Sequence, residues 1–213
     1  MKKWCLLVVW MLIPVLLPAQ DTLRRVYVGT DLLKNVWPLV GIYPDVRSAY
    51  TVEPFVSIQL RNPHQYLHVT PGFTKFSSRE ASSSVLSGRG YYLKVGVERR
   101  KRNFGVGLAG LVVAWQDEGT YRFVGSYFGD YIGRIPRQNR VAVGGEFFLS
   151  ALVLIKTRLA VRLQPRVTVL APFTNHADRP DPPFVPGVGL VEGSRWKVSN
   201  GLSIQLIYRT SPN

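Results

Sequence analysis

Charged residues recur at every second or fourth position in several segments, where they alternate with apolar residues. Arg158, Arg162 and Arg166 stand on one face of the segment from Thr157 to Leu170, and leucines, valines and a proline stand on the other. On the inner face of a closed sheet, such charges are costly unless acids and bases pair. We therefore predict an ion-pair network that fills the interior. Its expected members are Asp31, Glu53, Glu98, Glu146, Lys94, Arg158, Arg162 and Arg166.

Bases exceed acids on this predicted inner face, which also includes Arg25 and Lys197. A narrow conduit that favours anions is therefore an alternative to simple packing. An eight-stranded barrel is just wide enough to be filled by its own side chains. We expect packing to be the main role of the network.

Hydrolytic chemistry would need a base beside a carboxylate or a nucleophile. The sequence has three histidines, and only His176 has acids close by, at Asp178 and Asp181. No spacing singles out a nucleophile, and Cys5 is the only cysteine. We predict no catalytic residues, no metal site and no cofactor, and we keep a lipid-modifying enzyme acting at the barrel rim as an alternative.

A proline-rich stretch precedes the last apolar segment. Proline fixes φ and removes a backbone donor, so this stretch should be stiff and should not join a sheet ladder. A stiff loop binds partners with a smaller loss of entropy. It is a candidate partner-binding loop, with a plain connector as the alternative, and its named residues are Pro182, Pro183, Phe184, Pro186 and Gly187.

The elements that must position these residues are strands, because apolar residues recur with period two along most of the chain. No later segment has a helical period or an apolar run of membrane-spanning length. Eight strands are predicted, at about 25–32, 52–60, 67–73, 91–98, 104–116, 141–155, 157–170 and 196–209.

The joins between these strands alternate strictly between short and long. Short joins are expected at Arg61–Pro63, Arg99–Asn103 and Ile155–Thr157, and long ones at 33–49, 77–89, 117–139 and 171–194. This asymmetry is typical of an outer-membrane barrel, with short periplasmic turns and four longer external loops. Residues 121–136 are placed in an external hairpin or an aromatic loop.

The composition of the two faces favours a membrane barrel over a soluble β-domain. One face is apolar over long stretches, and the other carries Gly, Ser, Ala, Thr and Tyr with charges of both signs. A lipid-facing exterior around a filled polar interior has this pattern. Aromatic residues near the expected strand ends would form interfacial girdles. They are Trp37, Tyr43, Tyr50, Tyr66, Tyr91, Trp115, Tyr121, Trp196 and Tyr208.

The first segment predicts export. Lys2 and Lys3 precede an apolar run from Cys5 to Leu17, and Ala19 gives a small residue before Gln20. This is the order of a signal peptide, so we expect a leader at 1–19 and a barrel domain at 20–213. The chain has 27 Lys and Arg against 13 Asp and Glu. For an exported protein this charge favours outer-membrane lipid or lipopolysaccharide phosphates over nucleic acid as partners.

The last strand resembles the β-signal that the barrel-assembly machinery recognises, through Ser199, Gly201, Ile204, Leu206 and Tyr208. The resemblance implies this machinery as a partner during biogenesis. The chain ends on Thr210-Ser211-Pro212-Asn213, and not on an aromatic residue.

Three short stretches also resemble a family of small, uncharacterised outer-membrane barrels of Bacteroidota. They are Val28–Leu32, Gly90–Glu98 and Val185–Gly189. The resemblance implies an eight-stranded barrel and no catalytic residues. The expected function is therefore a non-enzymatic accessory or structural barrel of an envelope complex for assembly or transport. A soluble periplasmic ligand-binding barrel is the further alternative.

Overall fold

The computed structural model describes residues 25–33, 46–80, 84–123, 125, 129–172, 184–190 and 196–210. The predicted leader at 1–19 lies outside these ranges. The described residues form β1 (Val26–Asp31), β2 (Val46–Val52), β3 (Pro54–Gln59), β4 (Gln65–Glu80), β5 (Ser84–Lys101), β6 (Phe104–Phe123), β7 (Tyr131–Leu154), β8 (Leu159–Pro172), β9 (Phe184–Val185), β10 (Gly189–Leu190) and β11 (Lys197–Arg209).

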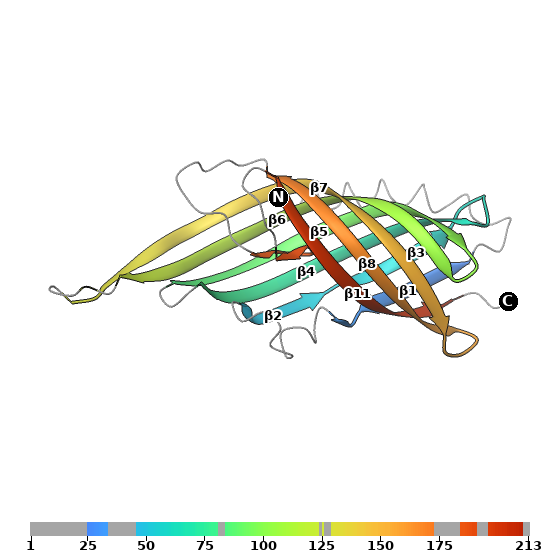
Figure 1. Ribbon diagram of the computed structural model, residues 1–213, viewed down its shortest axis with the longest axis horizontal. Coiled ribbons are helices and arrows are strands. Elements are labelled where there is room, and N and C mark those ends of the chain that lie inside the picture. The colour runs from blue at the N-terminus through green and yellow to red at the C-terminus, as the bar shows by residue number, and fades with distance from the viewer. Residues whose placement is uncertain are drawn as a thin grey trace, which may run out of the picture.

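Nine of these strands form one closed ring of antiparallel pairs (Figure 1). The order is β2-β4-β3-β1-β11-β8-β7-β6-β5, and β5 returns to β4. β2 and β3 both pair with β4 and are separated only by Glu53, so together they occupy one position. The ring therefore has eight positions, and β1 closes it against β11. The predicted eight-stranded antiparallel barrel is confirmed.

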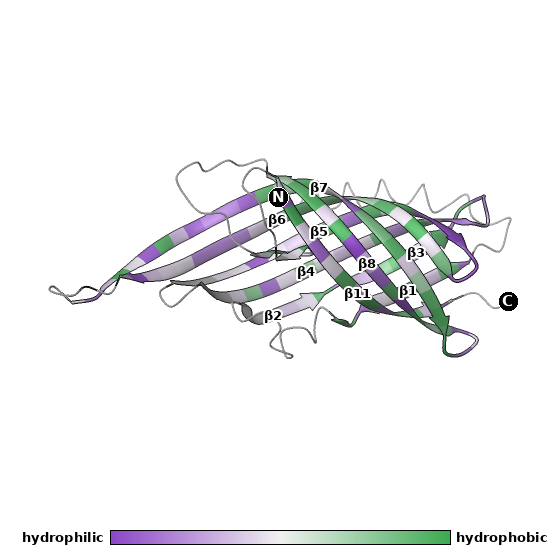
Figure 2. Ribbon diagram, in the orientation of Figure 1, coloured by the Kyte–Doolittle hydropathy of each residue, from purple (hydrophilic) through white to green (hydrophobic). Residues whose placement is uncertain are grey.

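Side chains alternate between the interior and the exterior along each strand, as the pleat requires. In β8, Arg162 and Arg166 are buried while Leu163 and Val167 between them are exposed. The residues of the other strands follow the same order, and Figure 2 shows the apolar segments gathered on the barrel body. The interior therefore holds many polar and charged side chains, and the outer surface of the barrel body is largely apolar.

Two of the expected long joins are mostly strand. β4 and β5 stay paired up to Glu80 and Ser84, and β6 and β7 stay paired up to Phe123 and Tyr131. The assignment of 77–89 and 117–139 to loops is wrong. In 77–89, polar residues stand on both faces, so no apolar alternation marks the strand. The segment 117–139 does contain aromatic and apolar residues, but an additional strand there would have broken the expected alternation of short and long joins. The hairpin expected within 121–136 is confirmed as the tip of a long β6–β7 extension (Figure 1).

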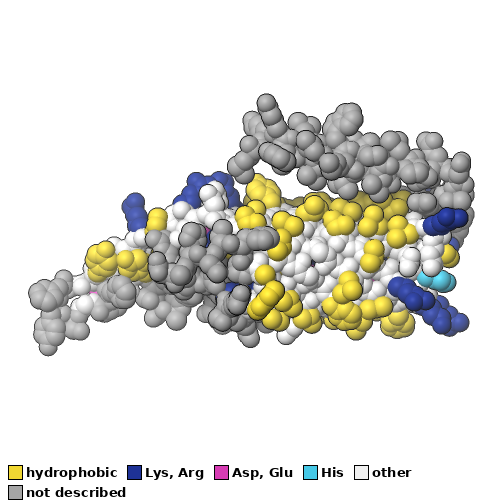
Figure 3. Space-filling view, turned by 90° about the horizontal axis from the view of Figure 1, so that it is seen from above, with side chains coloured by type: hydrophobic (Ala, Val, Ile, Leu, Met, Phe, Trp, Pro, Cys, Tyr) yellow, Lys and Arg dark blue, Asp and Glu magenta, His cyan; other side chains and the backbone are white. Residues whose placement is uncertain are grey.

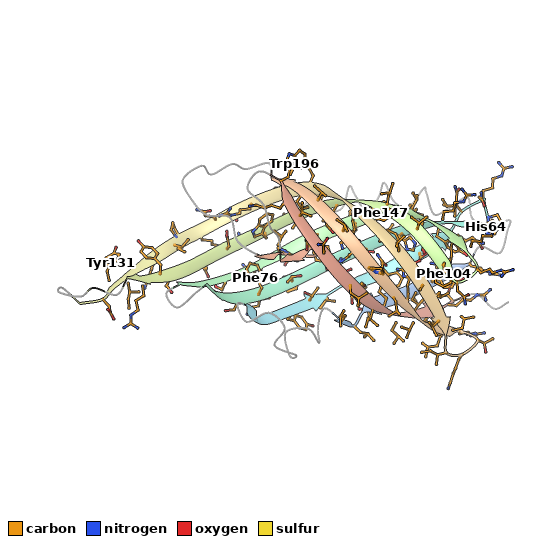
Figure 4. The ribbon with its side chains drawn as sticks, viewed as in Figure 1. His64, Phe76, Phe104, Tyr131, Phe147 and Trp196 are labelled. Carbon is orange, nitrogen blue, oxygen red and sulfur yellow. The ribbon has the colours of Figure 1, made fainter. Side chains whose placement is uncertain are left out.

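The two ends of the barrel differ. At one end, here called the short-turn end, Arg102 and Asn103 join β5 to β6, and residues 155–158 join β7 to β8. Arg25 and Thr210 flank the first and last barrel strands at this end. The opposite end carries the β6–β7 extension, and Figure 4 shows Tyr131 far from His64 and Phe104. Within the described ranges, no helix is long and apolar enough to cross a membrane.

The aromatic residues divide between the two faces. Tyr91, Trp196 and Tyr208 are exposed on the outer surface, as expected for a girdle. Tyr66 and Trp115 instead lie inside the barrel, so their assignment to a girdle is wrong. Both were placed by their nearness to strand ends. For Tyr66, the alternation with Leu67 and Val69 would have placed the side chain inside, whereas both faces of 104–116 carry apolar residues and leave Trp115 undecided. Trp37 and Tyr43 lie outside the described residues.

Candidate functional site

Glu98 is the centre of the first of two charged clusters in the lumen. Its side chain is buried on β5, and one carboxylate oxygen accepts a hydrogen bond from Arg100 Nη2 at 2.7 Å. The same oxygen lies 2.6 Å from His68 Nε2 and 3.3 Å from Arg162 Nη1. Ser150 donates its hydroxyl to the other oxygen. The single carboxylate of Glu98 thus contacts two guanidinium groups and an imidazole.

Glu146 is the centre of the second cluster. Its Oε2 atom accepts hydrogen bonds from Lys94 Nζ at 2.8 Å, from Thr168 Oγ1 at 3.1 Å and from Arg166 Nη1 at 3.3 Å. All four residues are buried and come from β5, β7 and β8. Removing such charges from water is unfavourable, and close hydrogen-bonded pairing offsets part of that free energy.

The remaining two predicted acids are also held by hydroxyl groups. Tyr92 donates its hydroxyl to Glu53, and Ser203 donates to Asp31 at 2.7 Å. Between the two charged clusters, a cavity of about 20 Å³ remains, lined by residues that include His68, Glu146 and Arg162. That space admits about one water molecule. The lumen is therefore packed by its own polar side chains over this layer.

A short hairpin, β9–β10, closes the lumen above the second cluster, and we call residues 185–188 the plug. Val185, Pro186 and Val188 are buried. Val185 and Val188 pack in an apolar cluster with Leu111, Trp115 and other inward residues. The plug therefore completes one of two buried apolar clusters in an interior that is otherwise rich in polar and charged side chains.

Arg166 connects the plug to the charged network. Besides Glu146, its guanidinium donates to the carbonyl oxygens of Gly187 and Val188, each at 3.4 Å. The Ser199 hydroxyl also donates to the Val188 carbonyl at 3.4 Å. These bonds satisfy buried backbone acceptors that the sheet ladder does not reach.

Seven of the eight predicted network residues lie buried in the lumen, where the structure groups Glu98 with Arg162, and Glu146 with Lys94 and Arg166. The placement of Arg158 inside is wrong. Arg158 is exposed in the turn before β8, and its Nη1 lies 3.4 Å from the Tyr208 hydroxyl. The predicted strand began at residue 157, whereas β8 begins at Leu159, so the in-and-out alternation of side chains does not apply to Arg158.

The sequence reasoning missed other members of the site. Of the histidines, only His176 was expected to have acids close by, but His68 contacts Glu98. Arg100 was assigned to a tight turn, whereas β5 continues to Lys101 and directs Arg100 inward. Lys94, Glu98 and Arg100 are separated by even numbers of positions, so period-two alternation would have placed all three side chains on the same inner face.

The predicted partner-binding loop is corrected for two of its residues. Pro186 and Gly187 belong to the plug and are buried, so they offer no surface to a partner. Phe184 lies in β9, which pairs with β10 and with no barrel strand in the described part of the chain. Pro182 and Pro183 fall outside the described residues, as do His176, Asp178 and Asp181. No group of three or more His, Cys, Asp or Glu in the described ranges could hold a metal ion.

Comparisons with known proteins include a structural similarity to a solved structure. No protein-family model matches the chain, and no curated protein matches it. The crystal structure of Neisserial surface protein A aligns with a TM-score of 0.40 at 9% sequence identity. The alignment covers 87% of this chain and 94% of that protein. The closed barrel described above rests on the strand pairing of this chain alone.

Proposed function

We propose that the protein is a small, non-enzymatic β-barrel that spans a bacterial outer membrane. The observation that carries this proposal is the inverted distribution of polarity. Phe104, Leu108 and Val112 on β6 are 71%, 61% and 51% exposed, whereas Glu98 and Glu146 are only 1% and 3% exposed. A soluble barrel buries its apolar face, so these exposures support a lipid environment.

The apolar exterior is continuous across neighbouring strands. Leu108 lies between Val97 of β5 and Phe147 of β7 in the strand register, and both neighbours are also exposed. Figure 3 shows apolar side chains over the barrel body and Lys or Arg side chains towards its ends. Water-soluble monomers rarely expose apolar patches of this extent, which again supports burial in lipid.

An accessory or structural role within the envelope is proposed from the filled lumen. The two charged clusters and the plug occupy the path along the barrel axis, so solute passage is not the function that the geometry supports. The rims and the β6–β7 extension remain as surfaces for other envelope proteins and for lipopolysaccharide. The barrel-assembly machinery would act on β11, which closes the ring against β1.

The test is to isolate outer-membrane and soluble periplasmic fractions and to run each unheated and boiled on a denaturing gel. A folded membrane barrel resists the detergent until it is boiled, so the band should lie in the membrane fraction and shift on boiling. Recovery after osmotic shock, without a shift, would replace this proposal with a soluble periplasmic barrel. Gentle extraction of the membrane form would then identify proteins that purify with it.

A further inference from the structure

A basic cavity opens at the short-turn end, on the far side of Glu98 from the plug. It has a volume of about 160 Å³ and is lined by Arg25, Arg100, Arg102, Arg158 and Arg209 together with tyrosines and apolar residues. No Asp or Glu of the described chain is among its lining residues. We call this cavity the arginine vestibule. Its lining concentrates positive charge in a partly enclosed space, which attracts anions.

Arg100 forms the floor of the vestibule, and contacts with its neighbours hold it in place. The Arg100 guanidinium lies 4.4 Å from the centre of the Tyr66 ring and 5.6 Å from that of Tyr27. Hydrogen bonds from Arg100 to Glu98 fix the orientation of the planar guanidinium group. Glu98 also contacts Arg162 and His68, so its single negative charge neutralises only part of the positive charge around it. An anion entering from the mouth therefore meets a guanidinium that is already in place.

Arg102 at the mouth has an unusual backbone conformation. Its φ is 55°, in the left-handed region, and no other described residue except glycine has a positive φ. Glycine adopts this conformation without the steric penalty that a side chain adds. Arg102 therefore stands in a backbone conformation that favours glycine, and its charged side chain lies at the mouth of the cavity.

The vestibule lies at the edge of the apolar band. Leu154 lines it and is 65% exposed, and Phe104 directly follows the Arg102–Asn103 turn. Figure 4 places Phe104 and His64 at this same end of the barrel. In a membrane, lipid phosphates lie where the apolar band ends. We propose that the arginine vestibule binds the phosphate of an anionic phospholipid headgroup, an inference that rests on the proposed membrane location.

The experiment uses the protein purified from membranes in a maltoside detergent, which contains no phosphate. Native mass spectrometry would count bound lipid after addition of phosphatidylglycerol, of phosphatidylcholine or of inorganic phosphate. The unchanged protein should retain phosphatidylglycerol in preference to phosphatidylcholine. Arg102→Gly relieves the left-handed strain while it removes a charge, so a loss of binding in this variant cannot be assigned to misfolding.

Each arginine removed should weaken phosphatidylglycerol binding about fivefold, as expected for one cation near an anionic lipid. Arg102→Gly and Arg158→Gln should show this loss singly and a larger one together. Arg134→Gln, which removes an exposed charge from the β6–β7 extension, is the matched control. Equal lipid binding by the double variant and the control would overturn the proposal. Binding of inorganic phosphate without phosphatidylglycerol would overturn the lipid assignment, whereas recovery of the protein in the soluble fraction would instead refute the membrane location.

Discussion

Gly187 in the plug lies directly against the ring of Tyr92 on the barrel wall. A Cβ atom on Gly187 would stand 2.5 Å from Cγ of that ring, and the φ of Gly187 is +76°. Tyr92 is held in turn by its hydrogen bond to Glu53. The plug, the wall and a buried acid are thus coupled through one aromatic side chain.

Gly187→Ala should destabilise the barrel and displace the plug. The left-handed backbone and the contact with Tyr92 together predict a loss of about 2–4 kcal/mol in the free energy of unfolding. Urea unfolding of the detergent-folded protein would measure it. Gly129→Ala is the control, because Gly129 also has a positive φ but no atom stands within 4 Å of its Cβ position. Equal losses in the two variants would show that the contact with Tyr92 has no effect.

Glu98→Gln should be among the most damaging conservative changes. Gln keeps the shape of the side chain but leaves Arg100 and Arg162 without their shared negative charge. Removing one partner of a buried ion pair typically costs about 3–5 kcal/mol. Glu118→Gln, at an exposed position of β6, provides the comparison. An unfolding midpoint unchanged from the parent protein would contradict the network.

Arg166→Gln should loosen the plug without unfolding the barrel. Glu146 keeps its bonds to Lys94 and Thr168, but the carbonyls of Gly187 and Val188 lose their guanidinium donor. A single cysteine placed by Val188→Cys would report this by its rate of maleimide labelling, because the expected leader contains the only native cysteine, Cys5. Labelling should be slow with Arg166 present and at least several times faster without it. Equal rates would mean that Arg166 does not hold the plug.

Much of this architecture follows from the sequence, because period two identifies strands wherever one face is apolar. That pattern alone predicts Glu98, Glu146, Arg162 and Arg166 on the inner face. It does not mark the outer ends of β5, β6 and β7, where neither face is continuously apolar and alternation carries little information. Arg100 was missed for another reason, because it was assigned to a turn although it continues the inward positions of Lys94 and Glu98.

The position of the plug could not be predicted from the sequence, for a different reason. Proline and glycine in residues 185–189 are typical of an exposed turn, and nothing local indicates that the turn inserts into the barrel. Its position depends on contacts with Tyr92, Arg166 and Ser199, which are distant in sequence. Local residue types predict that such a hairpin forms, but contacts in the assembled barrel determine where it lies.

Leu108→Arg should prevent stable insertion. A cation on the lipid face near the middle of a barrel costs about 2–4 kcal/mol, whereas the same change on a water-exposed surface is nearly neutral. Ile132→Arg is the matched comparison, since Ile132 is similarly exposed but lies on the β6–β7 extension. The yield of heat-modifiable protein in the membrane fraction should fall for Leu108→Arg and remain unchanged for Ile132→Arg. Equal yields would indicate that Leu108 does not face lipid.

The central claim, that the apolar exterior faces lipid, is tested most directly by fluorescence quenching in bilayers. Single cysteines introduced as Leu108→Cys and Ile132→Cys in the chain without its expected leader would carry a small fluorophore. The labelled proteins would be placed in vesicles made with or without lipids brominated along the acyl chain. We predict strong quenching at 108 and little at 132, because only residue 108 contacts acyl chains. No quenching at 108 in correctly folded protein would contradict the account.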